Sequence, residues 1–79
     1  MIDDAKPVGV GLVGYGYWGP NLARNFFRQA DCRLVAIHDL DPDALGKAGQ
    51  SFPSARLEDS FDDLLGNREI DAIAIATPV

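Results

Sequence analysis

The sequence predicts an α/β fold: a partial doubly wound parallel sheet with strand order 3-2-1-4, truncated after the fourth strand. Two observations support this prediction. Short apolar runs alternate with amphipathic stretches along the 79 residues. A glycine-rich turn, residues 14–19, joins the first apolar run to the first amphipathic stretch. Strands that alternate with helices pair in parallel, because each helix returns the chain to the same end of the sheet.

The first strand is expected over residues 8–13, directly before the turn Gly14-Tyr15-Gly16-Tyr17-Trp18-Gly19. This is a G-x-G-x-x-G pattern, and each glycine has its own role in nucleotide-binding turns. The first permits the tight turn, the second leaves room for a pyrophosphate, and the third lets the helix pack closely on the strand. The helix then directs its free N–H groups toward the phosphates. The pattern therefore predicts a dinucleotide site.

A helix follows the turn, because Pro20 suits a first helical position and apolar residues recur at helical spacing up to Ala30. Residues 33–39 then form an apolar run that ends in a carboxylate, Asp39, 20 positions after Gly19. An acid at this distance accepts hydrogen bonds from the adenosine ribose. Because a carboxylate repels a 2′-phosphate, the cofactor predicted is NAD rather than NADP.

The remaining elements have weaker signals. A second helix is expected to begin after Asp41 as N-cap and to end at Pro53, with Leu45, Ala48 and Phe52 facing the sheet. Residues 54–57 form a short third strand in this interpretation, and residues 60–65 a short helix capped by Ser60. Residues 70–76 form an apolar fourth strand.

Side-chain alternation suggests how the first and fourth strands meet. Gly9, Gly11 and Val13 share one face of the first strand, and small residues such as Ala72 and Ala74 share one face of the fourth. We expect these small faces to coincide and to admit a closely packed helix.

Composition excludes several classes of function. The net charge of −5 argues against nucleic acid or an anionic membrane as a partner. The single cysteine, Cys32, cannot form an internal disulfide, and no apolar run approaches the roughly 20 residues of a membrane span. A cytoplasmic protein is therefore expected. The acidic cluster of residues 58–63 suits helix capping, and no metal site is predicted.

Three stretches together carry a family resemblance: residues 14–26, Asp39-Leu40-Asp41, and Ala76-Thr77-Pro78. From residue 8 onward the chain resembles the Gfo/Idh/MocA oxidoreductases, and residues 17–22 are similar to members acting on nucleotide-linked sugars. The resemblance implies an NAD-dependent enzyme that transfers a hydride between the nicotinamide and a sugar or nucleotide-sugar. The cofactor contacts it implies are Gly14, Gly16, Tyr17, Trp18, Gly19, Asp39, Leu40 and Thr77.

The resemblance also implies what this chain lacks. Family members have a Glu-Lys-Pro motif after the fourth strand and a catalytic histidine in a second domain. Residues 1–79 would be the N-terminal portion of the dinucleotide-binding domain, with no catalytic residue and at most nucleotide binding of their own. The only histidine, His38, is interpreted as a structural or surface residue that points away from the Asp39 side. The full-length protein is expected to be a homo-oligomer.

Two other functions use similar turns. A non-enzymatic regulatory domain that senses NAD(H) would share the glycines and Asp39. A methyltransferase that binds S-adenosylmethionine would also combine a glycine turn with a ribose-binding acid, although its first strand usually ends in an acid where Val13 stands here.

Overall fold

The structure is a computed structural model in which residues 6–77 are described. It contains strands and helices in strict alternation, as the sequence predicts. In chain order they are β1 (Val8–Val13), α1 (Gly19–Arg28), β2 (Cys32–His38), α2 (Pro42–Ser51), β3 (Arg56–Glu58), α3 (Phe61–Leu65) and β4 (Ala72–Ile75).

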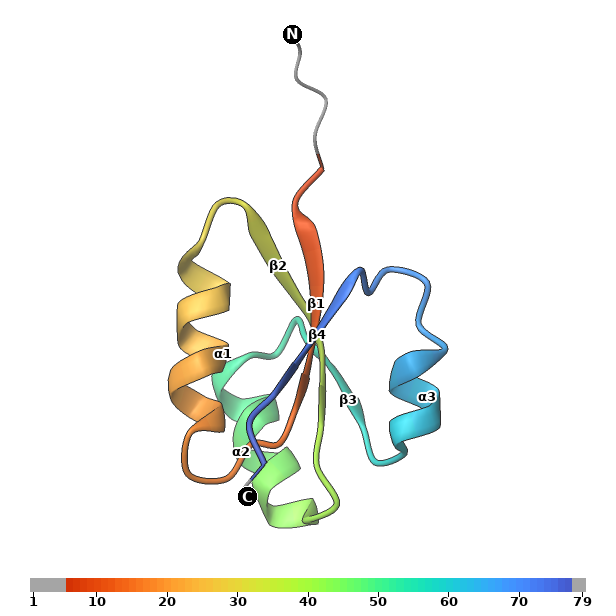
Figure 1. The fold of residues 1–79 in the computed structure, drawn as a ribbon. Helices are drawn as coiled ribbons and strands as arrows, with labels where there is room; N and C mark the ends of the chain where they lie inside the picture. The colour runs from red at the N-terminus through yellow and green to blue at the C-terminus, as the bar shows by residue number, and fades with distance from the viewer. Residues whose placement is uncertain (1–5, 78–79) are drawn as a thin grey trace, which may run out of the picture.

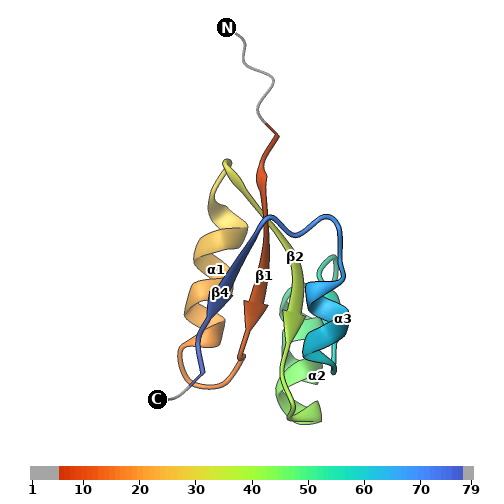
Figure 2. The ribbon, with the colours of Figure 1, turned by 45° about the vertical axis from the view of Figure 1, so that its right-hand side comes forward.

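The four strands form one parallel sheet in the order β3-β2-β1-β4, which confirms the predicted fold class. Figure 1 views the sheet nearly edge-on, with α1 and α2 on one face and α3 on the other. Turning the molecule places β4, β1 and β2 side by side (Figure 2). All four strands therefore end at the same edge of the sheet, which also holds the glycine turn.

A bulge in β2 determines which residues face each layer. Val10 pairs with Leu34, but Gly11 pairs with Ala36, so Val35 is an extra residue in β2. Leu34 and Ile37 pack in the core beneath α1 and α2, whereas Val35 and Ala36 pack toward Leu64 of α3. The regular alternation assumed from the sequence is thus interrupted once.

The expected match between the small faces of β1 and β4 is wrong. Gly11 pairs with Ile73, and Leu12 pairs with Ala74, so Gly11 and Ala74 lie on opposite faces of the sheet. In three of the four pairs a large side chain lies beside a small one, because Val10 also pairs with Ala72; only Val13 and Ile75 are both large. The glycines of β1 admit the connection before β4 instead, because a Cβ at Gly9 would lie 1.8 Å from the Glu69 carbonyl oxygen.

The N-caps of α2 and α3 agree with the sequence, whereas the bounds of β3 and β4 do not. Asp41 accepts the Asp43 N–H, and the Ser60 hydroxyl accepts the Asp63 N–H, so both predicted N-caps are confirmed. The third strand covers 56–58 rather than 54–57, because the Ala55 N–H bonds the Phe52 carbonyl in the turn after α2. The fourth covers 72–75 rather than 70–76.

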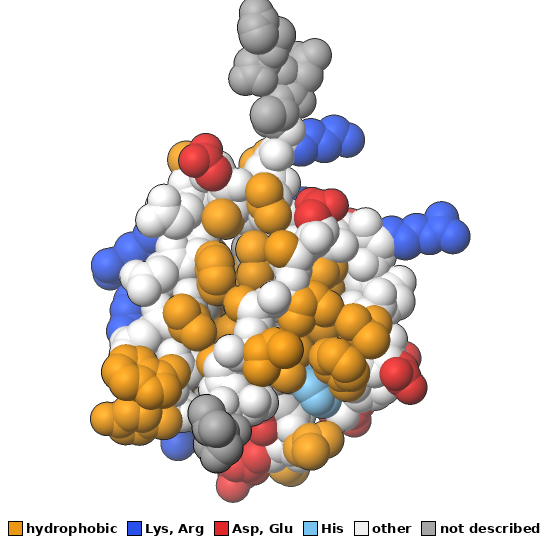
Figure 3. Space-filling view, viewed as in Figure 1, with side chains coloured by type: hydrophobic (Ala, Val, Ile, Leu, Met, Phe, Trp, Pro, Cys, Tyr) orange, Lys and Arg blue, Asp and Glu red, His pale blue; other side chains and the backbone are white. Residues whose placement is uncertain are grey.

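Within residues 6–77, β1 is the single sheet neighbour of β4. Figure 3 looks onto the side of the sheet that β4 forms and shows hydrophobic side chains gathered along it. Ile75 is two-thirds exposed there, and Ile73 is also exposed. In the same part of the chain, no helix is long and apolar enough to cross a membrane.

The close approach at Gly9 predicts a stability difference between two glycine-to-alanine variants. Gly9→Ala should lower the free energy of unfolding by about 2–3 kcal/mol, because the added methyl group overlaps the Glu69 main chain. Gly46→Ala adds a methyl group in open space inside α2, and should raise it by about 0.5–1 kcal/mol. Urea unfolding of both variants checks this; equal effects would contradict the packing described.

Candidate dinucleotide-binding site

The glycine turn leaves β1 through a backbone conformation that few residues adopt. Gly14 has a φ of 102°, which favours glycine. A Cβ at this position would also lie within about 3.0 Å of the carbonyl carbon of Ala76. The Gly14 N–H donates to the His38 carbonyl oxygen at 2.8 Å, which ties the start of the turn to β2.

The other two glycines of the motif have opposite surroundings. A Cβ at Gly19 would lie 2.3 Å from the Gly14 carbonyl oxygen, so α1 starts in direct contact with the end of β1. A Cβ at Gly16 would meet nothing within 4 Å. Gly16 is therefore not required by the protein's own packing, and its missing side chain leaves space beside the main chain. This space suits the close approach of a pyrophosphate.

The N-terminus of α1 is open to an anion. Trp18 is the N-cap residue, but its side chain makes no capping hydrogen bond, and the first turn contains no acidic residue. The first N–H groups of a helix lack partners inside the helix and carry the positive end of its dipole. The arrangement can therefore donate hydrogen bonds to phosphate oxygens beside Gly16.

Asp39 connects the end of β2 to the glycine turn. One carboxylate oxygen accepts the Tyr15 N–H at 2.7 Å, and the other accepts the Asp41 N–H at 2.8 Å. Each carboxylate oxygen has two lone pairs, so each keeps one for a further donor. The carboxylate is held in place before any ligand arrives, and it can still accept bonds from a pair of ribose hydroxyls.

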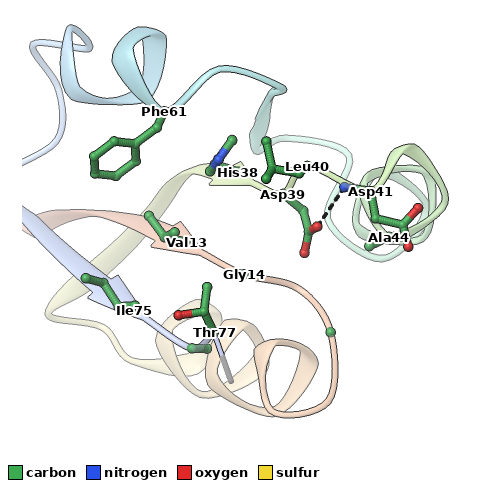
Figure 4. A pocket seen from close by; sticks show the side chains of 12 residues that line it. Val13, Gly14, His38, Asp39, Leu40, Asp41, Ala44, Phe61, Ile75 and Thr77 are labelled. Carbon is green, nitrogen blue, oxygen red and sulfur yellow. Dashed lines mark hydrogen bonds between the residues drawn. The ribbon is translucent and has the colours of Figure 1, made fainter. Parts of the chain in front are cut away.

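A pocket of about 540 Å³ opens at the carboxyl ends of the strands. Figure 4 shows Asp39 and Thr77 on one side of this pocket and His38 with Phe61 on the other. The residues that line it come from the ends of β1, β2 and β4 and from the starts of α2 and α3: Val13, Gly14, Gly16, His38, Asp39, Leu40, Asp41, Ala44, Phe61, Ile75, Ala76 and Thr77.

Five of the eight predicted contact residues line this pocket: Gly14, Gly16, Asp39, Leu40 and Thr77. Gly19 supports the turn from behind, through its contact with Gly14. Tyr17 and Trp18 lie outside the pocket lining; both are exposed, and their rings contact each other edge to face with centroids 5.2 Å apart. Tyr15 is buried against Phe52, as expected of a packing residue.

His38 is structural, as one of the two interpretations held, but it is not a surface residue. The ring is only 5% exposed, and Nδ1 lies 2.9 Å from the Glu58 carbonyl oxygen. It points toward α3, on the other side of the sheet from Asp39, as the alternation predicted. Sequence reasoning missed that His38 and Phe61 line the pocket. The signal was available, since the predicted parallel topology gathers all strand ends at one edge.

The fold and the site together define a dinucleotide-binding α/β domain of the Rossmann type. Residues 8–79 match the model of the Gfo/Idh/MocA family, described as an oxidoreductase family with an NAD-binding Rossmann fold. The chain belongs to this family. The resemblance inferred from the glycine turn, Asp39 and Thr77 is confirmed, and the family supports neither the sensor nor the methyltransferase alternative.

Similar proteins include inositol 2-dehydrogenases from Rubrobacter xylanophilus and Acidothermus cellulolyticus. The first is 37% identical over an alignment of 79 residues, and the match covers 99% of this chain and 22% of that protein. The second is 33% identical over an alignment of 75 residues, and the match covers 91% of this chain and 21% of that protein. The chain thus spans about a fifth of the length of these curated relatives.

A solved structure with a similar fold is scyllo-inositol dehydrogenase from Lactobacillus casei with bound NAD(H) and scyllo-inositol. It is 28% identical to this chain, with a TM-score of 0.82 over 92% of this chain and 22% of that one.

The different surroundings of Gly16 and Gly19 predict different costs for the same substitution. Gly19→Ala should destabilise the domain by about 2 kcal/mol or more, because the methyl group would overlap the Gly14 carbonyl. Gly16→Ala should change stability by no more than about 0.5 kcal/mol, since its methyl group meets open space. Thermal unfolding of the two variants measures the difference. A Gly16→Ala variant as unstable as Gly19→Ala would show that the turn is packed differently.

Proposed function

We propose that residues 1–79 are the N-terminal portion of the NAD-binding domain of a longer oxidoreductase. In this proposal the complete protein transfers a hydride between the nicotinamide and a hydroxyl-bearing carbon of a sugar, a cyclic polyol or a nucleotide-sugar. Relatives named inositol 2-dehydrogenase support a cyclic polyol most directly. The catalytic groups and the substrate site would come from the rest of that protein, whose homo-oligomeric state stays a prediction.

The observation that carries the proposal is the pairing of open space at Gly16 with the carboxylate of Asp39 in one pocket. The pyrophosphate would lie against Gly14, Gly16 and the start of α1 at Gly19. The adenosine ribose would bond Asp39. Leu40 and Thr77 would border the adenosine, and Tyr17 and Trp18 would offer main-chain N–H groups to the phosphates.

The same geometry favours NAD over NADP. The Asp39 carboxylate is fixed by two main-chain N–H groups, and Asp41 lines the same pocket. A 2′-phosphate would place further negative charge beside both acids, and the described residues that line the pocket include no lysine or arginine to offset it. When NAD is bound it supplies the hydride acceptor; this chain's own residues bind and orient it.

A titration of the full-length protein with NAD, NADP and S-adenosylmethionine tests the proposal. Gly16→Val should weaken NAD binding at least 100-fold, because the isopropyl group occupies the space meant for the pyrophosphate. Its unfolding temperature should stay close to that of the wild type. Gly46→Ala is the control, because Gly46 lies outside the pocket lining and should leave the NAD affinity unchanged. Undiminished binding by Gly16→Val would refute the proposed position of the cofactor.

Asp39→Ala should weaken NAD binding by about 1–3 kcal/mol, the scale of hydrogen bonds to a charged group. The loss for NADP should be smaller, because removing the carboxylate also removes its repulsion of the 2′-phosphate. Isothermal calorimetry of both cofactors with both proteins gives the two differences. An unchanged ratio of NAD to NADP affinity would show that Asp39 does not face the ribose.

A further inference from the structure

The proposed function leaves the imidazole of His38 without a role in the pocket, and this inference rests on that function. His38 Nδ1 faces the Glu58 carbonyl oxygen at 2.9 Å. A carbonyl oxygen can only accept, so Nδ1 carries the proton and donates. In the neutral ring, Nε2 is then an acceptor with a free lone pair. The contact with β3 thereby fixes which nitrogen of His38 can accept a bond.

Nε2 is reachable by a ligand. Among the described residues, Nε2 has no hydrogen-bond partner. In the same part of the chain, every side-chain nitrogen or oxygen that is fully buried has such a partner, so Nε2 is not fully buried. The atom therefore keeps some contact with solvent although the ring is almost buried, and His38 lines the pocket. The pocket is the route by which a donor can reach Nε2.

The surroundings of this acceptor suit a flat aromatic ligand. The Phe61 ring lies beside His38, with centroids 6.0 Å apart, and remains 42% exposed. Figure 4 shows Phe61 and His38 across the opening from Val13 and Ile75. The side chains of Phe61, Val13 and Ile75 thus border a slot in which His38 Nε2 is a hydrogen-bond acceptor. The slot and Asp39 lie on different sides of the strand ends. His38, Phe61 and Asp39 line the same pocket, so a ligand bonded to Asp39 shares that pocket with the slot.

We propose that His38 reads the adenine base: Nε2 accepts a hydrogen bond from the exocyclic N6 amino group while the Phe61 ring packs on the base. The amino group is the hydrogen-bond donor of the adenine base, whose ring nitrogens are acceptors. Hypoxanthine has a carbonyl oxygen in place of this group and would set a lone pair against Nε2. His38 is therefore a specificity-determining residue of the cofactor site, in addition to its structural bond with Glu58.

The test compares NAD with nicotinamide hypoxanthine dinucleotide, in which a carbonyl oxygen replaces the N6 amino group and the neighbouring N1 carries a proton. Both are titrated into the full-length protein by calorimetry. The wild type should bind NAD about tenfold more tightly, the scale of one hydrogen bond made or lost. Equal affinities would overturn the role of His38 and leave the proposed function standing. Failure of both dinucleotides to bind would overturn both.

Two variants assign the discrimination to its residue. In His38→Asn the side-chain amide can still donate to the Glu58 carbonyl, but no atom replaces Nε2, so the affinity ratio should fall from about ten to about one. Phe61→Leu is the matched control: it removes packing on the base and should weaken both dinucleotides equally, with the ratio unchanged. A His38→Asn protein that keeps the wild-type ratio would refute the proposal, and unfolding curves verify that each variant is folded.

Discussion

The contact between Gly19 and the Gly14 carbonyl is the constraint on which the site depends. It brings α1 to the end of β1 at a distance that no side chain would permit. The helix can start there only because the chain reverses at once, and that reversal requires the positive φ of Gly14. Between these two closely packed glycines, Gly16 has open space at its Cβ position.

Much of the fold and of the glycine turn could be predicted from the sequence. The roles of the three glycines follow from their spacing, and the caps at Asp41 and Ser60 follow from side chains that bond the main chain two or three residues on. The parallel sheet follows from alternating strands and helices, and the order 3-2-1-4 is that of dinucleotide-binding folds with this glycine turn. Each of these features depends on residues close together in sequence, or on a topological rule that applies to any sequence with the same alternation.

Features that depend on how distant strands meet could not be read from the sequence. The bulge at Val35 has no glycine or proline of β2 to mark it, and it shows only in the pairing with β1 and in the packing of Val35 and Ala36 toward α3. The register between β1 and β4 also depends on the segment before β4, where Glu69 presses on Gly9. The glycines of β1 therefore correctly indicated that another part of the chain packs closely on this strand. They did not indicate that this part is the segment before β4.

The bulge determines toward which face of the sheet His38 and Asp39 point, and regular alternation from Leu34 would give the opposite directions. Leu34 packs toward α1 and α2, and in a regular strand every second residue after it would do the same, including His38. The extra residue at Val35 shifts the pattern by one, so His38 faces α3 and Asp39 reaches the glycine turn. Bulges commonly re-aim side chains beside functional sites. Here a single inserted residue separates the carboxylate on the phosphate side of the pocket from the imidazole on its apolar side.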